Sequence, residues 1–284
     1  MADHRGDCPV AWACDALEVS ESGYYAWAGR APSPAELRRG QLLVAIEQVH
    51  AEVKGRYGSP RMTAELNARG FACTENTVAQ LMKAHGIRAK APRRFVRTTD
   101  SRHGLPVADN VLGRDFGPPG PNVAWAADIT YIPTADGWLY LAVVEDLFSR
   151  MIVGWSMGEA MTSRLAVDAL EMALRRRLPG AGLLAHSDRG SQYASDHYQR
   201  LLGQRGITCS MSRRADCWDN APVESFFASL KRELVHDEKY TTREQAKASI
   251  FEYVEAFYNR VRLHSSLGFL SPEQFERSHN PNHP

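Results

Sequence analysis

The chain has 284 residues, more than one typical domain requires and enough for two. Its composition, 44% hydrophobic and 24% charged, is that of a globular protein, and it has neither a run of about 18 apolar residues nor a signal-peptide start. We therefore expect a cytoplasmic protein without a membrane segment. The net charge of +1 argues neither for nor against nucleic acid, and five cysteines without a Cys-x-x-Cys pair predict neither a disulfide framework nor a zinc site.

Residues 1–90 are predicted to form a helical DNA-binding region. The expected helices cover residues 11–17, 19–27, 41–53, 59–70 and 74–82, and Pro32 and Pro34 are expected to break the helical pattern before the third. Ser59 and Pro60 indicate a helix start, and Gly70 indicates its end. Two helices joined by a glycine-containing turn are typical of a helix-turn-helix, although helices that pack without DNA are the alternative.

A strongly basic stretch follows at residues 83–99. It contains no acid and six cations, which are Lys83, Arg88, Lys90, Arg93, Arg94 and Arg97. Local positive charge of this kind neutralises DNA phosphates, so we expect the last five to contact DNA, with a solvated linker as the alternative. Residues 91–121 also contain several prolines, and we interpret them as a basic, proline-rich linker.

Residues 122–277 have the pattern of a mixed α/β domain, and residues 278–284 are a tail. Strands expected at 123–132, 138–144 and 151–157 are separated by short spacers and should form an antiparallel meander. Strands at 182–187 and 207–211 then alternate with helices at 163–177, 196–204, 221–235 and 242–262. This order predicts a five-stranded mixed sheet with helices on its faces, whose strand order the sequence does not give.

Three carboxylates of this domain are candidate metal ligands. Asp128 lies within an apolar strand, Asp188 follows a buried strand, and Glu224 borders the apolar stripe of a helix that Asn220 is expected to cap. Taken singly, each has an ordinary alternative: a hydrogen-bonded core acid, a turn residue paired with Arg189, and a surface glutamate. Together, three carboxylates from one sheet can hold two Mg²⁺ ions about 4 Å apart, which suits in-line displacement at phosphorus.

Several motifs resemble those of the second-frame (OrfB-type) transposases of the bacterial IS-three family, and more broadly the DDE integrases and transposases. They are WAADITYI, VVEDLFSRMIVGWSM, HSDRGSQYAS, SMSRRADCWDNAPVESFFASLKREL and YNRVRLHSSLGFLSPEQF, with RYGSPRMTAELNARG and TVAQLMKAHGI upstream. Between Asp188 and Glu224 lie 224 − 188 − 1 = 35 residues, the spacing of this family, and Lys231 matches its basic residue two helical turns after the glutamate.

The resemblance implies an RNase H-like fold and Mg²⁺- or Mn²⁺-dependent cleavage and joining at transposon ends by Asp128, Asp188 and Glu224. The partners it implies are double-stranded DNA, both terminal inverted repeats and target, and a homo-oligomer on DNA in the bacterial nucleoid. It also implies a first-frame protein with a leucine zipper, fused by frameshifting; no sustained heptad pattern occurs here, so we expect that part to be absent. We expect Lys231, Arg260 and Arg262 to contact DNA, with structural ion pairing as the alternative for the two arginines.

Two features depart from the family pattern. Glu145 stands where an aliphatic residue is expected, beside Asp146; the pair either lies near the metals or is a solvated pair at a strand end. No His-His-Cys-Cys zinc domain precedes the core, which argues against a retroviral integrase. The rival functions are a structure-specific nuclease on the same fold and a catalytically inactive DNA-binding repressor.

Overall fold

The computed structural model describes residues 9–91, 106–213 and 217–279. Its centre is a five-stranded mixed sheet with the strand order β3-β2-β1-β4-β5. The strands are β1 (Ala124–Thr134), β2 (Gly137–Asp146), β3 (Met151–Gly158), β4 (Leu184–Ser187) and β5 (Thr208–Met211). The first three form the predicted antiparallel meander, and β4 and β5 continue the sheet in parallel with β1. The strand order thus places β1 at the centre, next to β4.

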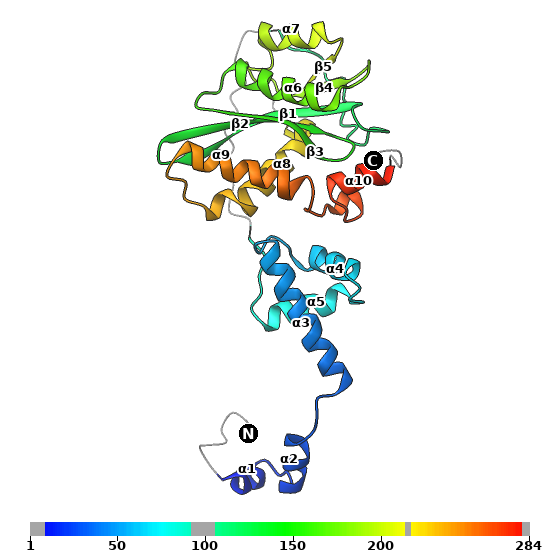
Figure 1. Cartoon of the computed structure of the whole chain (residues 1–284), viewed down its shortest axis with the longest axis vertical. Coiled ribbons are helices and arrows are strands. Elements are labelled where there is room, and N and C mark those ends of the chain that lie inside the picture. The colour runs from blue at the N-terminus through cyan, green and yellow to red at the C-terminus, as the bar shows by residue number, and fades with distance from the viewer. Residues whose placement is uncertain (1–8, 92–105, 214–216, 280–284) are drawn as a thin grey trace.

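Helices cover both faces of this sheet (Figure 1). α6 (Ser163–Arg177) and α7 (Asp196–Gln204) lie on one face, and α8 (Ala221–Glu233) and α9 (Arg243–Phe251) lie on the other. α6 packs so closely on β3 that a Cβ at Gly154 would collide with the backbone of Ala169. The mixed sheet with helices on both faces confirms the expected RNase H-like fold.

The chain after α9 differs from the prediction of one continuous helix. Residues Glu252–Tyr258 form a π-helix, which widens the turn and buries Tyr253, Val254, Phe257 and Tyr258 together. Short 3₁₀ segments cover Cys217–Asn220, Val235–Asp237 and Ser265–Leu267. The last helix, α10 (Pro272–His279), begins at the predicted capping box, in which Ser271 and Gln274 bond to each other's backbone N–H.

The N-terminal region is helical, as predicted. Its helices are α1 (Val10–Ala16), α2 (Glu21–Ala28), α3 (Pro34–Glu52), α4 (Ser59–Ala68) and α5 (Glu75–Ala84). α3 begins at Pro34, so the expectation that this proline breaks the helical pattern before residue 41 is wrong. Ser33 and Glu36 form a capping box, and a proline at the first helical position lacks only an N–H that would have no partner there.

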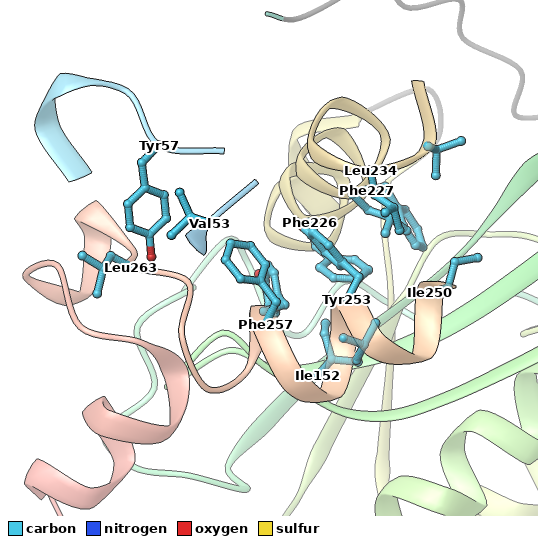
Figure 2. Close-up of a cluster of buried hydrophobic side chains, with 14 of the residues drawn as sticks. Val53, Tyr57, Ile152, Phe226, Phe227, Leu234, Ile250, Tyr253, Phe257 and Leu263 are labelled. Atoms are coloured by element: carbon cyan, nitrogen blue, oxygen red, sulfur yellow. Dashed lines mark hydrogen bonds between the residues drawn. The ribbon is translucent and has the colours of Figure 1, made fainter. Parts of the chain in front are cut away.

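Helices α3, α4 and α5 share one hydrophobic core with the sheet domain. Figure 2 shows Val53 and Tyr57, from the segment after α3, beside Phe257 and Leu263 of the C-terminal part. The hydroxyl of Tyr57 donates to the Val261 carbonyl at 2.9 Å and accepts from the Leu263 N–H at 3.1 Å. The helical region is therefore held on the sheet domain by direct packing, and not by the linker alone.

The part of the expected linker that the structure describes also packs on the core. Leu112 is buried, and its N–H and that of Val111 donate to the Ser210 hydroxyl of β5. Cys14, Cys73 and Cys209 are free thiols. Within the described ranges, no helix is both long and apolar enough to cross a membrane.

Candidate active site

Asp128 lies within β1, and Asp188 directly follows the neighbouring parallel strand β4. Ala127 of β1 is paired with Ser187, the last residue of β4, and the two aspartates are the next residues along their strands. Residues at equivalent positions of parallel strands lie at the same level of the sheet and on the same face. The fold therefore brings the two carboxyl groups together at one edge.

The start of α8 is fixed beside Asp128. Asn220, which precedes the helix, donates from Nδ2 to the carbonyl oxygen of Ala127 at 3.2 Å. The expectation that Asn220 caps α8 is wrong, because its side chain makes no capping hydrogen bond and reaches β1 instead. Glu224 lies in the first turn of α8, so this bond sets the position of the third carboxylate.

Asp219 anchors the same helix start from the other side. Its buried carboxylate accepts from Arg213 and from Arg114 Nε at 2.7 Å, and from Asn110 Nδ2 at 2.8 Å. Hydrogen bonds from Arg213 hold the pKa of Asp219 well below its usual range. Sequence reasoning missed this acid, whose only signal is its place beside the arginines of RRADCWDN.

The electrostatics indicate that the predicted residues face one another. Removal from water raises the pKa of Asp128 well above its ordinary value, and the charges of Asp188 and then Glu224 raise it further. The Ile129 N–H, 2.7 Å from Asp128 Oδ1, and the charge of Lys231 act in the opposite direction. A nearby cation would therefore favour the carboxylate form of Asp128.

Lys231 lies on the same side of α8 as Glu224. Its Nζ is 5.1 Å from the ring centroid of Tyr131 on β1. Burial lowers the pKa of Lys231, while the charge of Asp128 raises it. The lysine is thus near Asp128.

Gly190 orients the carboxylate of Asp188. The Gly190 N–H donates to Asp188 Oδ1 at 2.8 Å, and a Cβ at position 190 would lie 2.9 Å from the same oxygen. A side chain at position 190 would therefore displace this carboxylate.

Tyr193 and Asn220 extend the site beyond the residues that the sequence singled out. The Tyr193 hydroxyl and Asn220 Oδ1 are buried without a hydrogen-bond partner among the described residues. Burial raises the pKa of Tyr193, and the charge of Asp128 adds to the effect. Both residues stand in quoted motifs, but nothing in the sequence shows that their polar atoms lack partners.

The described part of the chain contains no group of three His, Cys, Asp or Glu side chains that could hold a metal ion as they stand. Like charges repel when no cation lies between them, and this repulsion favours a wider spacing. The prediction that the three carboxylates lie close enough to share ions therefore stays a prediction.

Comparison with known proteins identifies the family. Models of an integrase core domain match residues 118–217 and 224–279, and a model of an HTH-like domain matches residues 37–95. Transposase InsF for insertion sequence IS3A of Escherichia coli strain K12 is 46% identical over 275 residues, 96% of each chain. The insertion element IS600 uncharacterized 31 kDa protein of Shigella sonnei is 43% identical over 267 residues, 94% of this chain and 98% of that one.

This chain belongs to the IS3 family of transposases. It is therefore an enzyme with an integrase core, and residues 37–95 are its HTH-like domain. Among solved structures, the transposase is similar to the simian T-cell lymphotropic virus intasome in complex with PP2A regulatory subunit B56 gamma, with 17% identity, a TM-score of 0.49 and coverage of 84% and 76% of the two chains. It is also similar to the HTLV-2 integrase catalytic core domain in complex with magnesium, with 19% identity and a TM-score of 0.43. That match covers 56% of this chain and 98% of the integrase chain.

Glu145 and Asp146 of the transposase are not a solvated pair, so that expectation is wrong. Glu145 is 1% exposed and Asp146 is 0% exposed, because both lie in the part of β2 that the neighbouring strands and helices cover. Asp146 accepts from the N–H groups of Asn122 at 2.8 Å and Phe148 at 3.0 Å. Glu145 lies 3.6 Å from Arg150, and burial raises the pKa of Glu145 to about 7.

The cations expected to bind DNA have different surroundings. Arg88 and Arg260 are exposed, whereas Lys90 pairs with Asp237 at 2.9 Å. Arg262 is 3% exposed and pairs with Glu233 at 2.8 Å, which is the ion-pair alternative. The other three predicted contacts lie outside the described residues; they are Arg93, Arg94 and Arg97.

Proposed function

We propose that this transposase cuts DNA at the ends of an insertion sequence and joins the ends to target DNA, using Asp128, Asp188 and Glu224. The observation that carries the proposal is the position of the two aspartates, which follow paired residues of adjacent parallel strands. The hydrogen bond from Asn220 to Ala127 brings the first turn of α8, and with it Glu224, to the same edge. The charges of Asp188 and Glu224 both raise the pKa of Asp128, which supports a cation shared by these three acids.

The three carboxylates suit a divalent cation. Three carboxylates supply the oxygen ligands that Mg²⁺ prefers, and Mn²⁺ accepts the same set. Asp128, Asp188 and Glu224 would hold two ions, which supply a polarised attacking oxygen and a stabilised leaving oxygen at phosphorus. Gly190 and Asn220 hold Asp188 and Glu224 in place, and Lys231 contacts a phosphate of the bound strand.

The substrates of this reaction are double-stranded DNA, the terminal inverted repeats and the target. The HTH-like domain would bind the ends, and its α5 follows a glycine-containing turn as a recognition helix does. Exposed Arg88 and Arg260 would contact phosphates, together with Arg93, Arg94 and Arg97. We further propose a homo-oligomer on DNA, a first-frame partner or fusion, and action at the nucleoid in the bacterial cytoplasm, where both substrates are found.

The test compares carboxamide variants on DNA that carries the ends of the element. Asp128→Asn, Asp188→Asn and Glu224→Gln should each abolish cleavage and strand transfer in Mg²⁺, because the loss of one ligand charge weakens metal binding. Binding of the same duplex should be nearly unchanged, and calorimetric titration with Mn²⁺ should show weaker binding. Asp168→Asn on α6, on the other face of the sheet, is the matched control and should behave like the parent.

Three outcomes would contradict the proposal. Variants that retain strand transfer would remove the three acids from the mechanism. A parent protein that nicks DNA but yields no joined product would be a nuclease. A parent that binds the ends without cutting them under any divalent cation would be a repressor on a transposase scaffold.

A further inference from the structure

A polar cavity of about 330 Å³ lies on a different side of α8 from Glu224 and Lys231. Its wall on α8 is formed by Pro222, Ser225 and Ser229, which recur at helical spacing. At about 100° per residue, Glu224 and Lys231 project from a clearly different side of the helix. Ser225 lies about 100° from Glu224 around the helix, so the cavity opens on a neighbouring face of α8, opposite to its buried stripe.

Four further segments close the cavity. Arg61 comes from α4, Glu145 and Arg150 come from β2 and the turn after it, and Arg262 and His264 come from the segment after the π-helix. The HTH-like region, the sheet and the C-terminal segment therefore meet around one polar space. A space shared by three regions that are far apart in sequence is a natural place for a ligand that spans them.

The lining is rich in hydrogen-bond donors. Each guanidinium offers five N–H donors. Among the described residues, Arg61 donates to the Leu263 carbonyl and lies 3.8 Å from Glu233. Arg150 donates to the Phe116 carbonyl and lies 3.6 Å from Glu145. The hydroxyls of Ser225, Ser265 and Ser266 add donors at the rim. Arg262 and His264 are already bonded to each other, with Arg262 held by Glu233. The unused donors therefore belong mainly to Arg61 and Arg150.

Among the described residues, Glu145 is the only carboxyl group in the lining, and the only carboxyl group with a buried oxygen that has no hydrogen-bond partner. Glu145 Oε2 has no hydrogen-bond partner among the described residues, although Glu145 is almost fully buried. Because its pKa is raised to about 7, this carboxyl binds a proton readily and can then donate a hydrogen bond into the cavity. Arginine N–H groups that have no acceptor among the described residues lie beside an acid that is easily protonated. This combination favours an anionic ligand with several hydrogen-bond acceptors.

We propose that this cavity binds a backbone phosphate of the DNA substrate, held by Arg61 and Arg150 beside a face of α8 that neighbours the face of Glu224. This rests on the proposed function, since it assigns a second contact to the same DNA. Arginine pairs with phosphate through two parallel N–H bonds, and a contact of this kind fixes the position of DNA without reading its sequence. A phosphate here would connect the HTH-like region to α8, and thereby position the bound strand relative to Glu224.

The experiment measures how DNA affinity depends on salt for the full chain and its variants, with a duplex that carries the element's ends, in a slightly alkaline buffer. Arg61→Gln and Arg150→Gln should each weaken binding and flatten the slope of log affinity against log salt by about 0.9. Glu145→Gln should strengthen binding severalfold, because it removes a negative charge beside the phosphate and nearly keeps the shape. Arg164→Gln, an exposed arginine on α6, is the control and should change nothing.

The result for Glu145→Gln distinguishes the proposal from simple damage, because a misfolded variant does not bind more tightly. If every cavity variant keeps the parent's slope while the parent binds DNA, the cavity proposal is overturned and the proposed function stands. If the parent binds no DNA, both are overturned. Titration with inorganic phosphate separates the sources: saturable binding that Arg150→Gln removes, with DNA slopes unchanged, assigns the cavity to free phosphate and overturns the DNA contact.

Discussion

Two kinds of buried acid lie around helix α8: acids that stabilise the fold and an acid proposed to act in the reaction. Asp219 before its start and Glu233 at its end are buried acids with several donors each, and the pKa of each is lowered. Asp128, which faces the first turn, has a raised pKa because burial and neighbouring acids act together. A buried acid surrounded by cations stabilises the fold. A buried acid surrounded by other acids needs a cation that the chain itself does not supply.

Glu145 lies between these two extremes. One arginine faces it at 3.6 Å, yet one of its oxygens has no hydrogen-bond partner in the described part of the chain. Burial wins over the single arginine, so the pKa rises to about 7. This acid is satisfied more easily as the neutral carboxyl than as the carboxylate.

The largest expected effect is a split between activity and stability at Asp128. Asp128→Asn should abolish strand transfer and raise the melting temperature near neutral pH, because the charged form of Asp128 is disfavoured in the fold. The sign follows from its raised pKa: the stabilising contribution is complete below the ordinary value of 3.8 and is lost as pH rises through the folded pKa. Asp219→Asn should do the reverse, with about 2 kcal/mol of stability lost and metal binding retained. Equal melting temperatures for the two variants would contradict the difference proposed between Asp128 and Asp219.

The next largest effect concerns Glu233, whose carboxylate is held by Arg262 at 2.8 Å and by the Tyr253 hydroxyl at 2.8 Å. Glu233→Gln should lower the free energy of unfolding by about 3–5 kcal/mol, because it leaves the buried guanidinium of Arg262 without its charge partner. Denaturant titration measures this loss. Glu238→Gln, an exposed acid five residues later, is the control and should cost little.

A smaller effect is expected from Glu145, and it depends on pH. Its folded pKa of about 7 lies above the ordinary 4.5, so the folded state binds the proton more tightly than the unfolded state. The stability from this group is therefore complete below pH 4.5 and is lost as pH rises to about 7, a change of about 3 kcal/mol. The parent should lose this amount relative to Glu145→Gln, and parallel pH profiles of the two would contradict the assignment.

The smallest stability change is expected from a substitution at Gly190, although this substitution should also slow the reaction. Gly190→Ala places a methyl group 2.9 Å from Asp188 Oδ1 and from Gln192 Oε1, which should cost about 1–3 kcal/mol. Displacement of the Asp188 carboxylate should slow cleavage up to about 100-fold, because small misplacements of reacting groups are costly. Gly203→Ala, which has open space, is the control in both measurements.

Local patterns predicted much of this fold. α6 and α7 begin and end at the predicted residues, since their apolar periodicity is bounded by turn residues on both sides. α3 was predicted too short because Pro34 was interpreted as a breaker, although Ser33 and Glu36 already carried the capping signal. The π-helix after α9 has no such local signal, because it depends on how its side chains pack against the rest of the domain.

Local patterns in the sequence single out the candidate carboxylates, but not the residues that support them. Asp128 and Asp188 could be found because acids that interrupt or end apolar strands are conspicuous. Asn220 was assigned to a cap because only the pairing of β1 with β4 shows that Ala127 offers its carbonyl there. The burial of Glu145 depends on Tyr258 and Arg262 from more than a hundred residues away, which no local pattern contains.

The core shared by the helical region and the sheet domain has a geometric consequence. Val78 and Met82 of α5 belong to the same cluster of buried residues as Phe226 and Leu230 of α8. If α5 binds the end of the element, this shared core would limit how far the bound sequence can move relative to Asp128. The packing of Tyr57 against Leu263 would then help to set the number of base pairs between the sequence bound and the bond broken.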